Sequence, residues 1–362
     1  MTSVETDVQS CLKTLTDPNT GKDFVTGKSV KKVAVTDGEV HVDIELGYPA
    51  VSQFDVIQEH IENALKQVAG VDKVRVHVRQ RIIAHVAQQG LKLLPGVKNV
   101  IAVASGKGGV GKSTTAVNLA LALVAEGAKV GMLDADVYGP SLPTMLGANG
   151  LPQSEDGETI EPLEAHGMQV MSIGFMIDVD TPMVWRGPMA TQALDQLLRQ
   201  TKWNDLDYLV VDMPPGTGDI QLTLAQKVPV TGAVIVTTPQ DIALIDARKG
   251  YKMFEKVGIP VVGIVENMSV HTCSNCGHTE RIFGEGGAAR MGADYQLPVL
   301  GALPLDLHIR EQADSGQPTV VSDPESKAAT LYKEIARKTA VAIARKAVDF
   351  SSKFPNIVVK NS

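Results

Sequence analysis

The chain has 362 residues, 44% of them hydrophobic and 33 of them glycine, so it is long enough for two domains with buried cores. A formal net charge of −7 and an aromatic content of 4% argue against a protein that coats a nucleic-acid backbone or stacks single-stranded bases. Its three cysteines make no disulfide framework and favour a reducing compartment. Residues 1–7 lack the basic and apolar segments of a signal peptide, and no apolar stretch approaches the roughly 20 residues that span a bilayer. We therefore expect a cytoplasmic protein without a membrane or nucleic-acid partner.

The first part of the chain alternates between helical and strand patterns. Apolar residues recur at threes and fours in two segments, and they alternate with polar residues in three others. The predicted elements are a helix over 3–16, strands over 30–35 and 40–46 joined by an Asp-Gly turn, a helix over 54–68 and a strand over 71–78. We expect a small α-β-β-α-β domain over residues 1–86. Cys11 falls on the apolar face of its first helix, where a cysteine is usually a small buried hydrophobe.

After a linker over residues 87–98, continuous apolar strands alternate with helices. The strands are expected at 100–104, 129–134, 208–212, 233–237, 261–266 and 299–302, and the clearest helices at 114–126, 241–257 and 325–348. Such apolar runs are typical of strands buried on both faces of a parallel sheet. We predict a doubly wound, mostly parallel α/β domain over 99–350, whose ligands bind at the carboxyl ends of its strands, and a tail over 351–362.

The strongest motif is a phosphate-binding loop. Residues 106–113 match G-x-x-x-x-G-K-[ST], directly after a predicted strand and before a predicted helix. The simpler alternative, a glycine-rich turn, does not require this strand–loop–helix context. In such a loop Lys112 reaches the β- and γ-phosphates, and the Ser113 hydroxyl ligates Mg²⁺. The residues expected to contact nucleotide are Gly106, Lys107, Gly108, Gly109, Val110, Gly111, Lys112, Ser113 and Thr114.

Carboxylates follow two other predicted strands. Asp212 ends an apolar strand about 100 residues after the loop, where an acid of a phosphate-loop site holds Mg²⁺, often through water. A glycine-containing loop over 213–219 follows and is suited to sensing a γ-phosphate. Asp134 and Asp136 end another strand, and one carboxylate there can orient the attacking water. The alternative is a turn with two solvated acids; we favour a catalytic role for Asp136.

Residues 106–113, G-K-G-G-V-G-K-S, resemble the deviant Walker A loop of the ParA/MinD/nitrogenase-iron-protein group of ATPases. The resemblance implies that Lys107 reaches across a dimer interface to phosphate bound in the other subunit. A cation supplied in this way stabilises transition-state charge as an arginine finger does. Hydrolysis of ATP would then depend on a homodimer, with Lys107, Lys112 and Asp136 as the catalytic residues.

Further stretches narrow the resemblance to the Mrp/ApbC family of iron–sulfur cluster carrier ATPases. They are Asp-Ala-Asp-Val-Tyr-Gly-Pro-Ser at 134–141, Trp-Arg-Gly-Pro at 185–188, Asp-Met-Pro-Pro-Gly-Thr-Gly-Asp at 212–219 and Cys-Ser-Asn-Cys at 273–276. The N-terminal unit is similar to the SufT/PaaD type of iron–sulfur assembly domain. Relatives of that domain often carry a cysteine near a proline, but residues 47–52 contain none. Cluster handling by the small domain itself is therefore not expected.

Cys273 and Cys276 have the spacing of metal ligands or of a redox pair, and chance in a loop is a third explanation. A zinc site of the Cys₂His₂ type remains open because His271 and His278 flank the pair. An iron–sulfur cubane wants about four thiolates, and two chains offer four. The family resemblance implies a [4Fe–4S] cluster bridged by two subunits.

The resemblance also suggests residues at the base of the nucleotide. An asparagine in the position of Asn267 hydrogen-bonds adenine in the wider ATPase group, although a strand-end turn is the simpler explanation. Asp306, in the segment after the last strand, is a weaker candidate for the same edge. Arg186 is carried as an interface or switch candidate.

The sequence thus predicts a homodimer that binds and hydrolyses ATP with Mg²⁺, carries a [4Fe–4S] cluster and passes it to apo iron–sulfur proteins, in contact with cluster-assembly factors. One alternative is a positioning ATPase like ParA or MinD, which acts on DNA or membrane. Another is a zinc-binding metal-chaperone ATPase.

Overall fold

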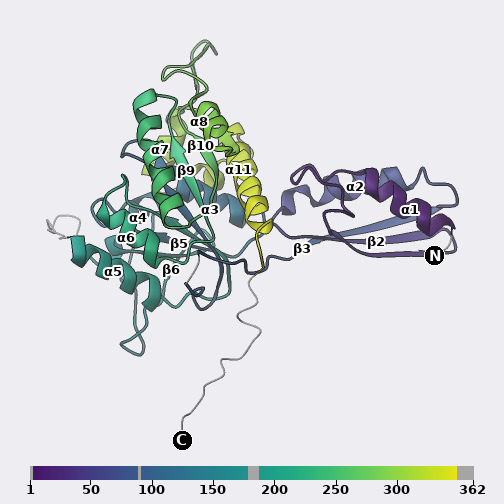
Figure 1. Ribbon diagram of the computed structural model, residues 1–362, viewed down its shortest axis with the longest axis horizontal. Coiled ribbons are helices and arrows are strands. Elements are labelled where there is room, and N and C mark those ends of the chain that lie inside the picture. Colours follow the sequence, from purple (N-terminus) through teal and green to yellow (C-terminus); the bar gives the residue numbers. More distant parts are fainter. Residues whose placement is uncertain (1–2, 89–90, 178–186, 349–362) are drawn as a thin grey trace, which may run out of the picture.

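The computed structural model describes residues 3–88, 91–177 and 187–348. Its elements form a three-stranded sheet with two helices and an eight-stranded sheet with helices on both faces, and the smaller unit projects from one side of the larger (Figure 1). A two-stranded hairpin lies in the loop that projects above helix α8 in the same view. The predicted fold class is confirmed. The boundaries at residues 86 and 99 stay our proposed division of the chain.

The small unit has the predicted α-β-β-α-β order. Its elements are α1 (Ser3–Thr14), β1 (Val30–Thr36), β2 (Glu39–Leu46), the short η1 (Val51–Gln53), α2 (Phe54–Leu65) and β3 (Lys73–Gln80). β2 is central, antiparallel to β1 and parallel to β3. Alternate residues of β2 and β3 are buried, and both helices cover that face (Figure 1). Cys11 is half-buried and packs against this core.

The large sheet has the strand order β13-β10-β9-β4-β8-β5-β7-β6. Its strands are β4 (Val97–Ala104), β5 (Val130–Asp134), β6 (Leu163–Ala165), β7 (Met168–Ser172), β8 (Leu206–Asp212), β9 (Gly232–Thr237), β10 (Val261–Glu266) and β13 (Val299–Ala302). All neighbouring strands are parallel except β6, which runs antiparallel to β7 at the edge. The carboxyl ends of β4, β5 and β8 therefore meet at one edge of the sheet.

Helices cover both faces of this sheet. They are α3 (Lys112–Ala125), α4 (Leu142–Leu146), α5 (Gly187–Gln200), α6 (Asp219–Lys227), α7 (Asp241–Lys256), α8 (Gly287–Tyr295), α9 (Leu307–Asp314), α10 (Thr319–Ser322) and α11 (Lys327–Ala344), with a short turn η2 (Ile173–Phe175). One apolar core contains residues of α3 and α11, and a second contains residues of α5 to α8. Successive residues of β4 alternate between the two cores, as a strand buried on both faces requires. None of the described helices is long and apolar enough to cross a bilayer.

The structure differs from the sequence-based expectation at several element boundaries. β4 begins at Val97 rather than at residue 100, because Val97 pairs with Leu206 of β8. β6 and β7 were not predicted, since Gln169 interrupts the apolar run of β7 and hydrogen-bonds Asn204 instead. The last helix ends at Ala344, four residues before its predicted end at residue 348.

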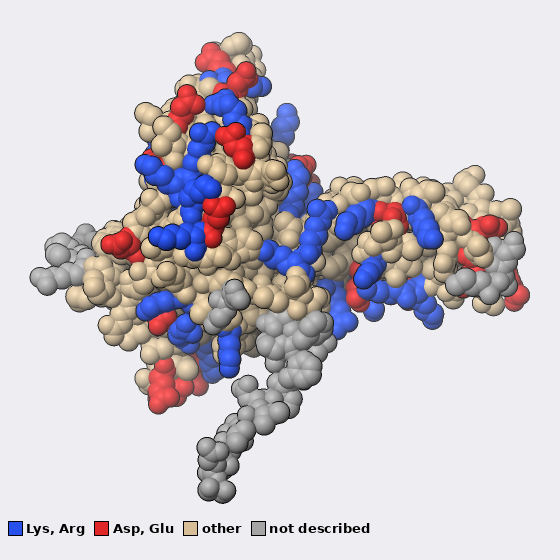
Figure 2. Space-filling model, viewed as in Figure 1, with Lys and Arg blue, Asp and Glu red and all other residues tan. Residues whose placement is uncertain are grey.

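Charges of both signs share the surface of helices α7 and α8. Figure 2 shows basic and acidic side chains interspersed over this part of the large unit. Two of the ion pairs join the helices or their flanks: Arg248 contacts Asp294 at 2.6 Å, and Arg290 contacts Asp241 at 3.0 Å. Each of these cations therefore has an acidic neighbour on the surface.

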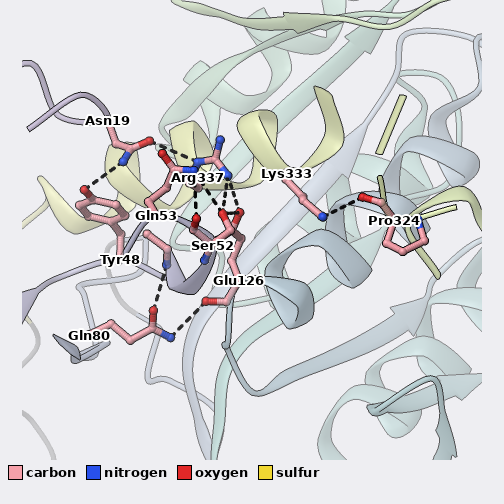
Figure 3. A network of polar contacts seen from close by, with 10 residues as sticks. Asn19, Tyr48, Ser52, Gln53, Gln80, Glu126, Pro324, Lys333 and Arg337 are labelled. Atoms are coloured by element: carbon pink, nitrogen blue, oxygen red, sulfur yellow. Dashed lines mark hydrogen bonds and ion pairs between the residues drawn. The ribbon is translucent and has the colours of Figure 1, made fainter. Parts of the chain in front are cut away.

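A polar network joins the small unit to the large one (Figure 3). Glu126, directly after α3, is fully buried; it accepts hydrogen bonds from the Ser52 backbone N–H at 3.1 Å and from the Ser52 hydroxyl at 2.7 Å, and pairs with Arg337 of α11. The Gln80 amide donates to the backbone carbonyls of Glu126 and Gly127 at 3.2 and 2.9 Å. The small unit therefore caps the C-terminal end of α3.

Candidate functional site

The phosphate-binding motif forms the connection between β4 and α3. Gly111 is the N-cap of α3 and has a φ of +78°, a conformation that favours glycine. A Cβ at Gly111 would also collide with the amide nitrogen of Asn267. The Ser105 hydroxyl donates to the Lys107 carbonyl at 2.8 Å and holds the start of the loop. The backbone N–H groups at the start of α3 thus face the carboxyl edge of the sheet, where an anion binds favourably.

Lys112 and Asp212 form a buried ion pair at the base of this loop. The Lys112 ammonium donates to Asp212 Oδ1 at 2.5 Å and to the Ser113 hydroxyl at 3.1 Å. Asp212 is fully buried, yet its Oδ2 has no hydrogen-bond donor within the described part of the chain. A buried carboxylate oxygen without a donor is costly unless a cation or water serves it. This oxygen and the Ser113 hydroxyl are oxygen ligands of the kind that Mg²⁺ prefers, so the residues present fit a magnesium site.

Asp134 holds the loop that follows β5. It is fully buried and accepts hydrogen bonds from the backbone N–H groups of Asp136, Ser141 and Leu142 at 3.0, 3.0 and 3.2 Å. The Ser172 hydroxyl, at the end of β7, donates to the same carboxylate at 3.0 Å. Burial, and then the neighbouring Asp212 carboxylate, raise the pKa of Asp134 to about 7. Its contacts make Asp134 the anchor of the loop.

Asp136 lies at the start of that loop and is only half-buried. Burial raises the pKa of its carboxyl group, while the positive charge of Lys112 acts in the opposite direction. The same cation lowers the pKa of Asp134, so Lys112 acts on both acids at the end of β5. Asp136 is thus the more accessible of the two carboxylates that the sequence placed near the nucleotide, and its role as base stays a prediction.

A cavity of about 190 Å³ lies beside the start of α3. It is lined by Gly111, Thr114, Met145, Asn267, Met268, Pro304, Leu305, Asp306, Ile309, Arg310, Ala313, Asp314 and Tyr332. Its walls are largely apolar with a few polar groups, which is the usual character of a small-ligand site. Sequence reasoning named four of these residues: Gly111 and Thr114 in the phosphate loop, and Asn267 and Asp306 for the base. It missed Met268 and Leu305, although each is adjacent in sequence to a named one.

The two residues named for the base, Asn267 and Asp306, also have local structural partners. The Asn267 amide donates to the Val110 carbonyl at 2.9 Å and so braces the phosphate loop from behind. Asp306 caps helix α9 by accepting from the His308 N–H at 2.9 Å. Both therefore have a structural role that does not depend on a base, and base recognition by them stays a prediction.

Lys107 differs from Lys112 in having a half-exposed side chain. Within the described residues its ammonium group makes no ion pair or hydrogen bond, so it is available to a group outside the chain. Large apolar side chains are exposed after several strands at the same edge of the sheet. These are Tyr138, Ile242, Ile245 and Leu307, with exposed fractions of 57%, 70%, 53% and 59%. Trp185 and Arg186 lie outside the described residues.

Cys273 and Cys276 lie in a tight loop closed by the hairpin of β11 (His271–Thr272) and β12 (Thr279–Glu280). The Cys273 N–H donates to the His278 carbonyl at 2.8 Å, and the Gly277 N–H donates to the Cys273 carbonyl at 2.9 Å. The Cys273 thiol is half-buried and that of Cys276 exposed. The backbone N–H of Cys276, then that of Asn275, lower the pKa of the Cys273 thiol, which favours the thiolate that binds metal.

The flanking histidines do not complete a metal site in one chain. The Nδ1 atom of His271 lies 3.1 Å from the Leu305 carbonyl oxygen, and His278 lies 3.5 Å from the Glu280 carboxylate. Nowhere in residues 3–88, 91–177 and 187–348 do three or more His, Cys, Asp or Glu side chains gather closely enough to hold a metal ion. One chain therefore presents two thiols at an exposed loop, and the alternative Cys₂His₂ zinc arrangement is not assembled in the described part of the chain.

Comparisons with known families match both units. Residues 96–340 match a model described as the NUBPL iron-transfer P-loop NTPase, and residues 5–78 match a model described as iron-sulfur cluster assembly protein. The iron-sulfur cluster carrier protein of Escherichia coli K12 is 52% identical over 337 residues, which cover 93% of this chain and 91% of that protein. The mouse iron-sulfur cluster transfer protein NUBPL is 51% identical over 273 residues, or 75% of this chain and 86% of that one.

Solved structures agree on the fold. A nucleotide-binding protein from Archaeoglobus fulgidus, solved in complex with ADP, is 38% identical with a TM-score of 0.56 and covers 64% of this chain and 90% of that one. The cell division ATPase MinD of Pyrococcus furiosus is similar in fold, with 24% identity and a TM-score of 0.52 over 66% of this chain and 97% of that one.

Proposed function

Because this chain belongs to the NUBPL iron-transfer P-loop NTPase family, we propose that it is an ATP-hydrolysing carrier that holds a [4Fe–4S] cluster between two subunits and transfers it to apoproteins. One observation carries the proposal. The same chain has a complete phosphate loop and an exposed two-thiol loop, with no group of three or more metal-ligating side chains among the described residues. A cubane needs about four thiolates, so a second copy of the chain completes the set.

The residues at the end of β8 and the start of α3 are suited to bind ATP and Mg²⁺. Lys112 turns from Asp212 to the β- and γ-phosphates, which exchanges one negative partner for another. The Ser113 hydroxyl and Asp212 Oδ2 would hold Mg²⁺, which would supply positive charge to the phosphates. Asp136, held in place through the anchored loop after β5, orients the attacking water.

Lys107 supplies its charge to the partner subunit in this proposal. Its half-exposed ammonium group has no partner among the described residues, and exposed apolar side chains lie at the same edge of the sheet. A second copy that covers these side chains would bring its own Lys107 to the phosphates. Hydrolysis would then be slow in the monomer and depend on dimer formation.

The small unit serves assembly and partner contacts in this proposal. It contains one cysteine, Cys11, whose half-buried position raises the pKa of its thiol, and residues 47–52 contain no cysteine. A raised thiol pKa disfavours the thiolate that ligates metal. Apo iron–sulfur proteins and cluster-assembly factors are the proposed partners of the whole chain.

Anaerobic reconstitution tests the cluster assignment. We expect the wild-type protein to retain about four iron and four sulfide per dimer, and the Cys273→Ala/Cys276→Ala variant to retain almost none. Cys11→Ala is the matched control, because it also removes a thiol but leaves the exposed loop intact. Equal iron and sulfide in the wild type and the double variant would reject the assignment. Zinc bound in place of iron after anaerobic purification would favour the metal-chaperone alternative.

The trans role of Lys107 has its own test. We expect Lys107→Ala to bind ATP nearly as well as the wild type but to lose most hydrolysis, about a 10³-fold fall in kcat by analogy with arginine fingers. Mixing Lys107→Ala with a binding-deficient Lys112→Ala chain should restore part of the activity, since each mixed dimer keeps one complete site. Full turnover by Lys107→Ala alone would contradict the proposal.

The positioning-ATPase alternative predicts binding to DNA or membrane in the presence of ATP. Arg248 on α7 and Arg290 on α8 already have acidic neighbours, which disfavours a broad phosphate-backbone contact there (Figure 2). Co-sedimentation with DNA and with anionic liposomes, with and without ATP, distinguishes the two functions. We expect no ATP-dependent pelleting with either.

A further inference from the structure

The nucleotide cavity and the cysteine loop share a segment of chain. Residues 267–271 leave the end of β10 and lead directly into β11, two residues before Cys273. Asn267 and Met268 line the cavity, and Met268 adopts a positive φ of 57° that turns the chain there. Only four residues, 269–272, separate the cavity wall from the first thiol.

A second segment, residues 303–305, lies beside the first and lines the same cavity. Ser269 contacts the Leu303 carbonyl twice, through its N–H at 2.9 Å and through its hydroxyl at 2.9 Å. The Leu305 N–H donates to the Val270 carbonyl at 2.8 Å. Leu305 itself lines the cavity. Because these hydrogen bonds join the two segments, a ligand that displaces Leu305 also moves the segment that leads to the cysteines.

His271 makes the last contact between the two segments. Its Nδ1 lies 3.1 Å from the Leu305 carbonyl oxygen, which only accepts hydrogen bonds, so Nδ1 carries the proton. Beyond His271 the cysteine loop is held by its own hairpin, with two residue pairs between β11 and β12. The imidazole is thus the contact nearest to Cys273 that ties the loop to the cavity wall.

We propose that His271 is a positioning residue through which the base of a bound nucleotide sets the orientation of Cys273 and Cys276. A purine seated against Met268 and Leu305 shifts the Leu305 carbonyl, and the imidazole passes this shift to the start of β11. The proposal goes beyond the carrier function, and it rests on that function only where the thiols are taken to bind a cluster. The coupling itself is a property of the chain without a cluster.

A competing route begins at the phosphates. The Asn267 amide bonds the Val110 carbonyl of the phosphate loop, so phosphate binding alone has a path to the same segment. The two routes differ in which part of the nucleotide matters. The route through His271 needs the base, whereas the route through Val110 needs only the phosphate chain.

Thiol alkylation of the cluster-free, reduced protein separates these routes. The rates of iodoacetamide addition to Cys273 and Cys276 are measured by mass spectrometry, with Cys11 in the same chain as internal reference. The probes are ADP, a non-hydrolysable ATP analogue and inorganic tripolyphosphate, each with Mg²⁺ at saturating concentration. We expect both nucleotides to change the ratio of rates about fivefold, at the lower end of common coupling factors, and tripolyphosphate to change it less than about 1.5-fold.

Substitutions at the two histidines show whether His271 carries the nucleotide response of the thiols. His271→Ala should bind ADP within about threefold of the wild type but lose the nucleotide response of the thiols. His271→Asn should retain at least half of it, because its amide can donate to the Leu305 carbonyl. His278→Ala is the matched control in the same hairpin, since its backbone carbonyl still accepts from Cys273. A thermal melt checks that each variant is folded.

Three results would overturn the inference: a wild-type response in His271→Ala, an equal response to tripolyphosphate, or no nucleotide response in the wild type. None of these measurements involves a cluster. Failure of the carrier function would instead appear as loss of iron and sulfide on reconstitution, with the thiol response intact. The two failures are therefore distinguishable.

Discussion

Helix α3 has a buried ion pair at each end, and the two pairs differ in one respect. At the N-terminal end Lys112 pairs with Asp212, whose second oxygen is buried without a donor in the described part of the chain. At the C-terminal end Glu126 pairs with Arg337, and Ser52 satisfies both carboxylate oxygens of Glu126 as well. The first pair thus leaves one carboxylate oxygen free to bind a ligand atom, whereas both carboxylate oxygens of the second pair already accept hydrogen bonds.

The comparison shows that burial and charge alone do not distinguish a ligand site from a structural junction. Both acids are fully buried, and both cations are at most one-tenth exposed in their side chains. The difference lies in the hydrogen-bond inventory. An unsatisfied buried oxygen costs free energy in the ligand-free state, and binding of a cation recovers it. A satisfied pair gains nothing from a ligand, so it fixes the arrangement of the two units instead.

The largest effect is expected from a substitution that breaks the ion pair at the N-terminal end of α3. Lys112→Ala should weaken ATP binding at least about 100-fold, which corresponds to losing about two charge-assisted hydrogen bonds of about 1.5 kcal/mol each. Titration calorimetry measures the ATP affinity of the variant and of the wild type. Lys129→Ala, which removes a surface pair with Asp205, is the control and should leave affinity unchanged within about twofold.

Breaking the C-terminal pair should affect stability rather than binding. Arg337→Ala leaves the Glu126 charge buried without its cation, so we expect the free energy of unfolding to fall by about 3–5 kcal/mol while ATP affinity changes less than about threefold. Urea denaturation and calorimetry measure the two quantities. The Glu126→Gln/Arg337→Met double variant should recover part of the loss, because no unpaired charge remains. A 100-fold loss of ATP affinity in Arg337→Ala would contradict the distinction between the two ends.

A smaller effect is expected from steric pressure on the junction. Gly127 has a φ of +86°, and a Cβ there would lie 2.5 Å from Val51 Cγ2 and 2.8 Å from Gln80 Nε2. Gly127→Ala should lower the free energy of unfolding by about 1–3 kcal/mol, the usual range for overpacking combined with a strained backbone. Gly250→Ala within α7 is the control, since a Cβ there meets nothing within 4 Å and should be stabilising by up to about 1 kcal/mol.

The smallest effect depends on pH and concerns the chain that leads from the junction to β4. His85 is buried against Asn99, with its Nδ1 3.0 Å from the amide oxygen, and burial lowers the pKa of its imidazole below 6.5. Below about pH 6.5 the unfolded chain therefore binds more protons than the folded one, and the free energy of unfolding falls as pH falls. The contribution is at most about 1.4 kcal/mol per pH unit. His85→Gln should flatten the pH dependence of urea denaturation between pH 7 and 5.5, and an unchanged slope would exclude His85 as its source.

Sequence reasoning named the candidate site residues that lie within short segments of the chain. The phosphate loop, Asp212 and the cysteine pair each follow a strand, and parallel strands bring their carboxyl ends together, so their common edge was predictable. Met268 and Leu305 were missed because an apolar residue after a strand has no pattern of its own. Ser172 was missed for another reason, because the strand that it ends, β7, was not predicted.

The amino-acid sequence by itself determined the order of the main strands and helices, the phosphate loop and the pair of thiols, because these depend on local periodicity and fixed spacing. Only the tertiary structure decided which polar groups from distant parts of the chain contact one another. Glu126 and Arg337 are 211 residues apart in the chain, and His271 and Leu305 are 34 apart. Such pairs follow from strand order and helix packing, which bring together residues whose separation along the chain contains no periodic signal. The structure thereby separates the satisfied end of α3 from the end that leaves an oxygen for a ligand.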